Sequence, residues 1–598
     1  MACPEIAGVT TASSRWMSPR VISRAVNTDF LRSYPSVASW RRSNRCQKLC
    51  IRARGNVCPT PNGNFGIQPH TRDVASQPET KAAPITIAPP ADMGLEHKPG
   101  DGIGMVEFLT GKSYFITGAT GLLAKVFIEK VLRSSPMVGK IYVLIRAKDE
   151  KTAFRRLKEE IIDCQVFHHQ RQKYGDNYEG FMLSKLVPVV GDIGEPDMGI
   201  GSPEVRNRIA NEVDVFVNSA ANTVLDERYD VSLNMNASGT LRALELAKNC
   251  KKLRIFLHVS TAYVNGTRQG LLPEKHFEMG QSITAEKSFS NGRPLPPPLD
   301  LREEIRLAKY IVDNVPECEA AQKMKEVGMA RATLFGWQNT YQFTKAMAEM
   351  VIHEQRDKVP VVIIRPSVIE STFQEPFPGW IQGNRVLEPV IITYGKGRLS
   401  GALADPEVVL DIVPLDVVAN TMVATMAKHG KSPEHGLHVY HATSSTVNPC
   451  TMYDLFRSFY LHFASAPLKD AKGSDIPVEE VKFFDSADDY QAHVERDVLQ
   501  KGMIESGITD PKAKLVNGLG RKYKRVAESI THLGKLYEPY FFNRVRFDNN
   551  NTDKLIKEMS GEERMAFPMD PREIDWEDYF VNIHIPGVRK HVLKKPIA

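Results

Sequence analysis

Short apolar runs alternate with stretches of helical spacing along residues 113–364. Apolar runs without polar alternation are typical of strands covered on both faces, and helical spacing between them is typical of crossover helices. The apolar runs lie at 113–117, 140–145, 186–190, 213–217, 253–259 and 361–364, and helical spacing follows at 122–130, 149–163 and 341–356. The alternation predicts an α/β fold with a doubly wound parallel sheet, whose ligand binds at the carboxyl ends of the strands.

A glycine-containing turn, TGATGLLA, connects the first apolar run to the first helical stretch. Gly118 allows the chain to turn sharply, and Gly121 lets the backbone approach a pyrophosphate at the N-terminal end of the helix. A strict GxGxxG pattern is absent, because Ala124 stands at the third position. By itself the motif is equally consistent with an ordinary strand–helix turn, so its interpretation depends on the residues that follow.

Polar and small residues at the next strand ends indicate where a dinucleotide would bind. Arg146 ends the second run, where an acidic residue would favour the ribose hydroxyls and an arginine favours the 2′-phosphate of NADPH. The alternative is a surface arginine at the start of the next helix. Asp192 follows the third run, where it would meet the adenine, and the small residues 219–221 after the fourth run permit close approach to the nicotinamide-side ribose.

Tyr341 and Lys345 are four residues apart on one predicted helix and therefore share a face. An ammonium beside a phenol favours the phenolate, so we expect the pKa of Tyr341 to be lowered and the residue to transfer protons near neutral pH. The YxxxK spacing is common by chance, and its alternative is an aromatic core residue beside a solvated lysine. Its position after a glycine turn and after a strand ending in Ser260 and Thr261 favours the functional interpretation.

Two regions lie outside the minimal fold. Residues 265–335 form a long insertion with several prolines and a charged helix from Asp300, which we interpret as a substrate-side lid or subdomain. From about residue 480 the pattern changes to amphipathic helices at 479–499 and 517–536, which predicts a separate, mostly helical domain.

The N-terminal segment differs in composition from the rest of the chain. Residues 1–60 carry ten Lys and Arg, two acidic residues and many serines, the composition of an organelle transit peptide, and the Pro-rich residues 61–105 predict a flexible linker. The alternative is a disordered tail without a targeting role. Chloroplast is favoured over mitochondrion because the opening residues lack a basic amphipathic helix. The formal net charge of the chain is +6 and that of residues 1–60 is +8, so the remainder is near neutral and nucleic-acid binding has no support from charge.

The cysteine spacing and the apolar runs bear on whether the protein binds a metal, contains disulfides or spans a membrane. No pair of the eight cysteines has the spacing of a zinc site or suggests a disulfide framework, so no metal is expected. No apolar run is long enough to predict a transmembrane helix.

Together, TGATGLL, VSTAYVNG and YQFTK resemble the extended short-chain dehydrogenase/reductases. The insertion and the C-terminal EPYFFNRVRFDN are similar to those of the fatty acyl reductases, and the leader resembles that of the plastid, male-sterility type in plants. The similarity covers residues 109–598. It implies an NADPH-binding Rossmann-type catalytic domain at 106–445 with the insertion at 265–335, and a C-terminal helical domain at 446–598.

The resemblance also implies a role for individual residues. Tyr341 would be the catalytic acid, Lys345 its partner and ribose ligand, and Asn236 the support of a proton relay. The second hydroxyl would be Thr261 or Ser260, with Thr261 favoured. The positions that correspond to cofactor contacts are Thr117, Gly118, Ala119, Thr120, Gly121, Leu122, Leu123, Arg146, Asp192, Ile193, Ala220, Tyr341 and Lys345.

The implied activity is reduction of a long-chain fatty acyl thioester by NADPH to a primary alcohol, for the pollen wall or a similar lipid polymer. In a plastid stroma the thioester would be acyl-ACP rather than acyl-CoA, and the basic segment 521–525 is a candidate surface for an acidic acyl carrier protein. A solvated helix face explains that segment equally well. Two other functions stay open: a reductase or epimerase of the same fold acting on a nucleotide sugar or hydroxysteroid, and a non-catalytic scaffold that binds a dinucleotide.

Overall fold

The computed structural model describes residues 102–291, 294–431, 435–505 and 517–593, which belong to a compact unit spanning 96–598. The predicted transit peptide at 1–60 and all but the last four residues of the predicted linker at 61–105 lie outside the described residues.

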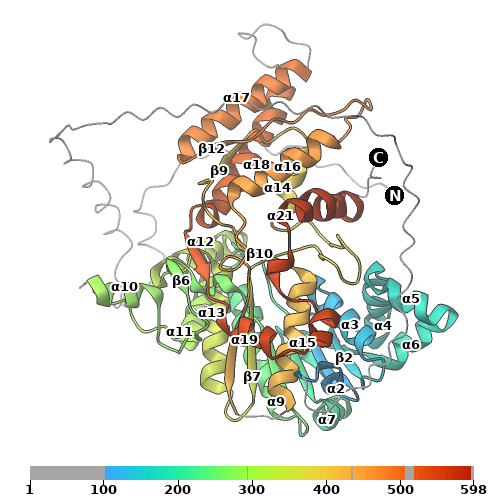
Figure 1. The fold of residues 1–598 in the computed structure, drawn as a ribbon. Coiled ribbons are helices and arrows are strands. Elements are labelled where there is room, and N and C mark those ends of the chain that lie inside the picture. Colours follow the sequence, from blue (N-terminus) through green and yellow to red (C-terminus); the bar gives the residue numbers. More distant parts are fainter. Residues whose placement is uncertain (1–101, 292–293, 432–434, 506–516, 594–598) are drawn as a thin grey trace, which may run out of the picture. The chain divides into compact units, whose positions relative to one another are not determined.

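The described residues contain a seven-stranded, all-parallel sheet with strand order β11-β7-β5-β4-β1-β2-β3 (Figure 1). This order confirms the predicted doubly wound α/β fold. The strands are β1 (Tyr114–Thr117), β2 (Ile141–Ile145), β3 (Leu186–Val190), β4 (Val215–Asn218), β5 (Ile255–Val259), β7 (Val361–Pro366) and β11 (Leu437–Ala442).

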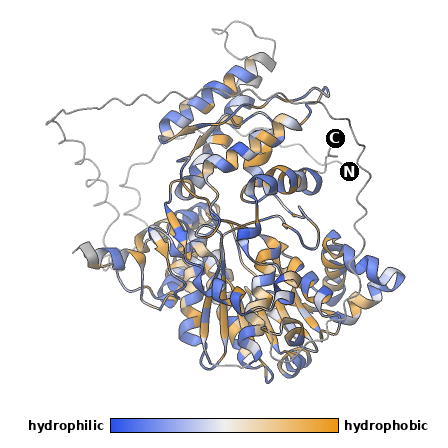
Figure 2. Ribbon diagram, in the orientation of Figure 1, coloured by the Kyte–Doolittle hydropathy of each residue, from blue (hydrophilic) through white to orange (hydrophobic). Residues whose placement is uncertain are grey.

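Successive side chains of the central strands enter two different cores. On β1, Tyr114 and Ile116 belong to the core shared with α3 and α15, whereas Phe115 belongs to the core shared with α7 and α9 and packs its ring against Phe216. Because both faces are covered, most residues of the strands are apolar, and Figure 2 shows this concentration of hydrophobic residues in the sheet. The helices named here are α3 (Leu122–Ser134), α7 (Pro203–Glu212), α9 (Gly239–Lys248) and α15 (Leu415–Lys431).

Helix α13 (Thr340–Gln355) carries the Tyr–Lys pair and is fixed at both ends. At its start Asn339 accepts a hydrogen bond from the backbone N–H of Gln342 (2.9 Å) and so caps the helix. Towards its other end Glu349 pairs with Arg365 of β7, and both side chains are fully buried. The helix is therefore anchored to the sheet by an ion pair as well as by apolar packing.

Within the insertion at 265–335, the residues that the structure describes contain a short strand, β6 (Gly270–Leu272), and three α-helices, α10 (Ile283–Asn291), α11 (Leu301–Asn314) and α12 (Glu317–Phe335). Asp300 caps α11, the charged helix that the sequence predicts. A core of its own joins these helices to α8 (Tyr229–Ser232) and α13. Within it the Tyr229 hydroxyl donates to Glu304 (2.7 Å), which also pairs with Arg331.

C-terminal elements pair with strands of the preceding part of the chain. Strand β12 (Lys482–Phe484) lies parallel to β9 (Gly401–Leu403), and β13 (Val545–Phe547) lies parallel to β6. Both predicted amphipathic helices are present, as α17 (Ala487–Glu505) and α18 (Asn517–Phe541), and they pack against each other. The start predicted for the first helix at 479 was wrong, because residues 482–484 pair with β9 as strand β12. The remaining main elements are α2 (Met105–Leu109), α4 (Glu150–Leu157), α5 (His168–Tyr174), α6 (Tyr178–Lys185), β8 (Val368–Glu370), α14 (Glu388–Gly395), β10 (Ile412–Pro414), α16 (Met452–Ser465), α19 (Asn550–Glu558) and α20 (Gly561–Ala566).

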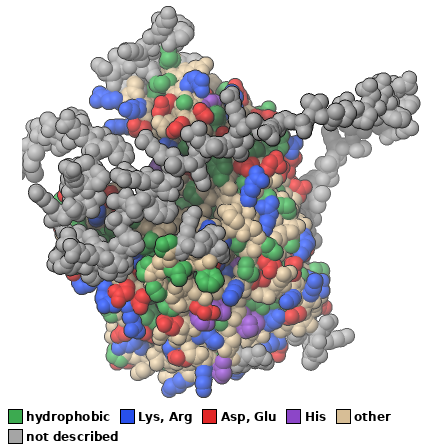
Figure 3. Space-filling view, turned by 90° about the vertical axis from the view of Figure 1, so that its left-hand side faces the viewer, with side chains coloured by type: hydrophobic (Ala, Val, Ile, Leu, Met, Phe, Trp, Pro, Cys, Tyr) green, Lys and Arg blue, Asp and Glu red, His purple; other side chains and the backbone are tan. Residues whose placement is uncertain are grey.

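Acidic and basic side chains are interspersed on the face seen in Figure 3. This agrees with the near-neutral charge of the chain beyond residue 60. Among the described residues, no helix combines the length and the apolarity needed to cross a membrane.

Candidate active site

A cavity of about 770 Å³ lies at the carboxyl ends of the parallel strands. Each of six neighbouring strands contributes a lining residue directly after it or within two positions of its end: Gly118, Arg146, Gly191, Ser219, Ser260 and Ser367. This is the edge at which doubly wound sheets bind their ligands, so the cavity is the candidate active site.

The predicted glycine turn forms the floor of the cavity. Gly118 has φ +70°, and a Cβ atom at this position would lie 2.8 Å from the backbone of Ala220. Thr117 holds the two strand ends together, since its hydroxyl donates to Asn218 Oδ1 (2.7 Å) and accepts from the Ala220 N–H (3.0 Å). A side chain at 118 would therefore push the strand ends apart.

The start of α3 faces the cavity with uncapped backbone N–H groups. Gly121 is the N-cap residue and no side chain caps the helix. Uncapped N–H groups and the helix dipole suit a pyrophosphate. Thr120, Leu122 and Leu123 line the cavity beside this helix end, whereas the predicted contacts Thr117 and Ala119 do not, and Ala119 is fully buried.

Two arginines lie at the end of β2, near Asp192. The Arg146 side chain is 75% exposed, and its Nη1 lies 3.8 Å from Asp192 Oδ2. Arg156 of α4 donates to the backbone carbonyl of Arg146 (2.5 Å) and also lines the cavity. Ile193, another predicted contact, lines the same end. The sequence analysis missed Arg156, whose only signal was its place in a charged helix.

Tyr341 and Lys345 both line the cavity, but they do not interact as predicted. Burial raises the pKa of Tyr341, Tyr540 adds to the rise, and a hydrogen bond with Thr261 opposes it. The expected lowering by Lys345 was wrong for this arrangement, because the Lys345 ammonium donates to the Val259 carbonyl (2.7 Å). Burial lowers the pKa of Lys345 to about 8, against an opposing effect of Glu349.

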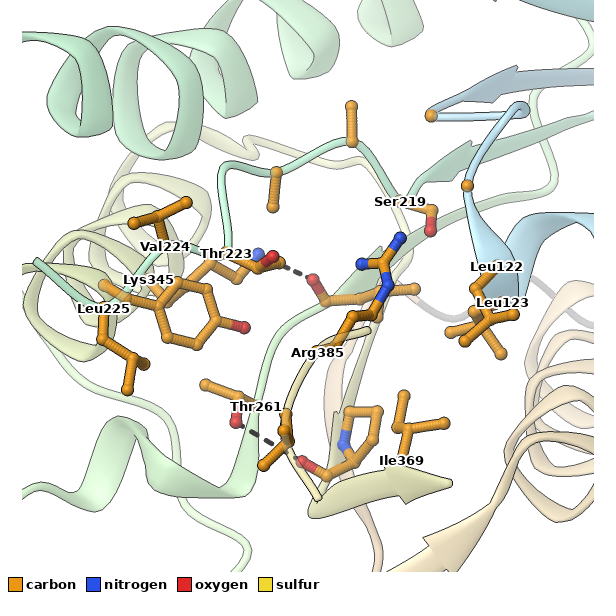
Figure 4. Close-up of a pocket in the computed structure, with 18 of the residues that line it drawn as sticks. Leu122, Leu123, Ser219, Thr223, Val224, Leu225, Thr261, Lys345, Ile369 and Arg385 are labelled. Carbon is orange, nitrogen blue, oxygen red and sulfur yellow. Dashed lines mark hydrogen bonds between the residues drawn. The ribbon is translucent and has the colours of Figure 1, made fainter. Parts of the chain in front are cut away.

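The two candidate hydroxyls after β5 have different partners. The Ser260 hydroxyl donates to the buried carboxylate of Glu349 (2.5 Å). Thr261 has a long bond to the Pro366 carbonyl (3.4 Å) and lies close enough to Tyr341 to oppose the rise in the pKa of its phenol. Figure 4 shows Thr261 and Lys345 on the same side of the cavity. Thr261 is therefore the hydroxyl that accompanies Tyr341.

Asn236 does not line the cavity but fixes two elements that do. It lies in a short π-helical segment at Leu233–Ser238 and is almost fully buried. Its amide nitrogen donates to the Asn222 carbonyl and to the Thr344 hydroxyl (both 3.0 Å), and its oxygen accepts from the Asn222 N–H (2.8 Å). It thus ties the loop after β4 to α13, on which Tyr341 and Lys345 lie.

A second part of the cavity wall is apolar. Apart from Leu122 and Leu123, which the sequence analysis predicted as cofactor contacts, it comes from segments that the sequence analysis did not connect with the site. The Arg385 side chain extends between Lys345 on one side and Leu122 and Leu123 on the other (Figure 4). The Tyr537 hydroxyl donates to the Arg385 carbonyl (3.2 Å). The apolar side chains of this wall are Leu122, Leu123, Val368, Ile369, Leu387, Leu410, Leu415, Leu536 and Phe541.

A parallel sheet of this strand order, with a glycine turn after its first strand and a Tyr–Lys pair on the helix that precedes β7, is the architecture of the extended short-chain dehydrogenase/reductases. Two family models, each described as male sterility protein, match residues 116–422 and 512–595. The chain belongs to the plant fatty acyl reductases of the male-sterility type.

The relatives and a solved structure are similar over most of the chain. The fatty acyl-CoA reductase 2, chloroplastic, of Arabidopsis thaliana is 47% identical over 83% of this chain and 80% of its own length. The alcohol-forming fatty acyl-CoA reductase of Simmondsia chinensis is 38% identical over 82% of this chain and 99% of its own. The terminal R domain of the myxalamid PKS-NRPS pathway is 16% identical, with a TM-score of 0.48, over 82% of this chain and 96% of that domain.

Proposed function

We propose that the protein reduces a long-chain fatty acyl thioester to a primary fatty alcohol with NADPH as the reductant. The observation that carries the proposal is one cavity that has a dinucleotide-type glycine turn, a Tyr–Lys pair with an adjacent threonine hydroxyl, and an extensive apolar wall. The printed names of the relatives, fatty acyl-CoA reductases and one alcohol-forming fatty acyl-CoA reductase, support it.

The cavity suits NADPH at three points. The space above Gly118, which a Cβ atom would fill, and the uncapped start of α3 would hold the pyrophosphate. Arg146 and Arg156 would hold the 2′-phosphate, and Lys345 the ribose. When bound, NADPH supplies a hydride to the acyl carbonyl carbon, and each two-electron step also consumes one proton.

The residues of the chain would handle the oxygen and the proton. Tyr341 and Thr261 would donate hydrogen bonds to the carbonyl oxygen as negative charge develops on it. The raised pKa of Tyr341 keeps its phenol protonated, so it can deliver the proton. Loss of the thiol from the first tetrahedral product leaves an aldehyde, and a second reduction at the same site gives the alcohol.

The cofactor assignment predicts the effect of Arg146→Ala. We expect the KM for NADPH to rise about tenfold and the KM for NADH to change little, because a charge-assisted bond to the 2′-phosphate is lost. Kinetics with both cofactors check this. Arg155→Ala serves as the control, since Arg155 of α4 forms an exposed ion pair with Glu159 and does not line the cavity. Unchanged selectivity between NADPH and NADH would contradict the role of Arg146.

The pKa of Lys345 predicts a pH dependence. If its ammonium positions the ribose and assists Tyr341, kcat for acyl thioester reduction should be constant below about pH 7 and fall as the pH rises through about 8, where the ammonium loses its proton. The pH profile at saturating NADPH measures this. In Lys345→Arg, whose guanidinium stays charged, the falling limb should move to higher pH. A wild-type profile without a falling limb up to about pH 9.5 would contradict the role.

We further propose a plastid location, with residues 1–60 as the transit peptide, acyl-ACP as the substrate and a role in lipid polymers such as the pollen wall. The printed name of one relative includes the word chloroplastic, which supports the location. Arg521, Lys522, Lys524 and Arg525 are exposed on α18 and would attract an acidic carrier protein.

The proposal is tested by NADPH oxidation with protein that lacks residues 1–100, with palmitoyl-ACP and palmitoyl-CoA side by side and the products extracted. Alcohol formed faster from palmitoyl-ACP is the expected result. Aldehyde alone would limit the activity to one hydride step. Cofactor binding without reduction of either thioester would contradict the proposed function and favour another substrate of this fold.

A further inference from the structure

The hydroxyl of Tyr540 lies beside Tyr341 although the two residues come from distant parts of the chain. Tyr540 is on α18 and lines the cavity. Its hydroxyl oxygen accepts hydrogen bonds from Asn339 Nδ2 (2.9 Å) and Gln342 Nε2 (3.0 Å). These two residues precede and follow Tyr341 in the sequence at the start of α13. The Tyr540 ring packs edge-on against Tyr263, two residues after Thr261, with centroids 5.1 Å apart.

The orientations of both amides are fixed by backbone groups. The Asn339 oxygen accepts from the Gln342 N–H (2.9 Å), so its nitrogen faces Tyr540. The Gln342 oxygen accepts from the Gln338 N–H (3.3 Å), so its nitrogen also faces Tyr540. The side-chain nitrogen of Gln338 in turn donates a hydrogen bond to the Pro539 carbonyl (3.3 Å), and its side-chain oxygen accepts one from Gln342 Nε2 (3.1 Å). Reversing either amide would break a bond to the backbone.

The direction of these bonds leaves the proton of Tyr540 available. An amide nitrogen can only donate, so the phenol oxygen accepts twice and both of its lone pairs are used. Its O–H group must then donate elsewhere, and no acceptor for it is found among the residues that the structure describes. Because Tyr540 lines the cavity, its O–H group can donate to a ligand bound there. Burial raises the pKa of Tyr540 to about 12, so the proton stays on the phenol at neutral pH.

We infer that Tyr540 donates a hydrogen bond to the acyl thioester bound beside Tyr341, as a second phenol donor that the C-terminal part of the chain adds to the site. The inference rests on the proposed function. Tyr540 would contact the reacting thioester group and strengthen this contact as negative charge develops on it. Three hydroxyls, those of Tyr341, Thr261 and Tyr540, would then donate hydrogen bonds that polarise the thioester group.

The test compares full-length wild type, Tyr540→Phe, Gln342→Met and Tyr490→Phe, each normalised to the NADPH-binding sites titrated by fluorescence. With palmitoyl-ACP and palmitoyl-CoA we expect Tyr540→Phe to lower kcat about 10- to 100-fold, with the Kd for NADPH within about twofold of wild type. Gln342→Met removes one amide donor but keeps the O–H, and kcat should stay within about threefold of wild type. Tyr490→Phe, which removes a hydroxyl bonded to the Ile530 carbonyl in the same helix pair, should be unchanged.

Three results would overturn the inference. An active wild type with an equally active Tyr540→Phe would remove the donor role and leave the proposed function intact. Equal losses in Tyr540→Phe and Gln342→Met would assign Tyr540 a structural role at the start of α13. A wild type that reduces neither thioester would overturn the proposed function and this inference with it.

Discussion

Replacing Tyr341 by phenylalanine is expected to lower kcat for acyl thioester reduction about 100- to 10,000-fold, the range typical for loss of a general acid. The substitution removes the phenol that would both hold the carbonyl oxygen and deliver the proton. Binding of NADPH should be nearly unchanged, because the ring stays in place and the phenol is not among the groups that would hold the phosphates. Single-turnover NADPH oxidation and a fluorescence titration of NADPH separate the two effects.

Tyr453→Phe is a matched control for this experiment, since Tyr453 is half exposed on α16 and does not line the cavity. It should behave as wild type. Turnover within about tenfold of wild type in Tyr341→Phe would contradict the assignment of the acid. A large loss of NADPH affinity would instead indicate that the phenol positions the cofactor.

Replacing Arg365 by methionine is expected to lower the free energy of unfolding by about 3–5 kcal/mol. Arg365 is fully buried, pairs with Glu349 of α13 and donates to the Lys275 carbonyl (2.8 Å) in the insertion. Its loss leaves the Glu349 carboxylate buried without its counter-charge. Glu349 also accepts a hydrogen bond from the hydroxyl of Ser260, which directly follows β5, so the packing of α13 against β5 should weaken as well.

Urea unfolding followed by tryptophan fluorescence measures this change. Arg306→Met is the control, because Arg306 forms an exposed ion pair with Glu303 on α11. Exposed pairs of this kind contribute about 0–1 kcal/mol, so the control should barely shift the midpoint. A shift in Arg365→Met no larger than that of the control would show that the buried pair contributes little to stability.

The sheet was predictable because its strands are buried on both faces. Continuous apolar runs marked six strands, and β3 at Leu186–Val190 coincides with its run. Strand β11 escaped prediction because its sequence LHVYHA includes His438 and His441, which interrupt the apolar run. His441 is nevertheless fully buried, and its ring nitrogen Nδ1 is hydrogen-bonded to the Asp548 carbonyl (2.6 Å), a tertiary contact that the sequence pattern does not show.

The residues of the site were predictable where they form a local motif or directly follow a predicted strand, as Arg146 does. The glycine turn, the Ser–Thr strand end and the Tyr–Lys pair each follow a local pattern, and the structure brings them into one cavity. Arg156, Arg385 and Tyr540 reach the same cavity through tertiary packing that no local spacing reveals. The pKa of Tyr341 was mispredicted for a related reason. Helical spacing shows that Tyr341 and Lys345 share a face of α13, but it does not show that the Lys345 ammonium donates a hydrogen bond to the Val259 carbonyl of β5.

The parallel pairing of β13 with β6 and the contact of Tyr540 with Asn339, 201 residues earlier in the chain, have a consequence for biosynthesis. A nascent chain that has emerged from the ribosome only as far as β11 already contains every strand of the central sheet. Its apolar cavity wall, however, still lacks Leu536 and Phe541 of α18. The apolar cavity wall is therefore complete only after α18 has been synthesised and has packed against the preceding part of the chain.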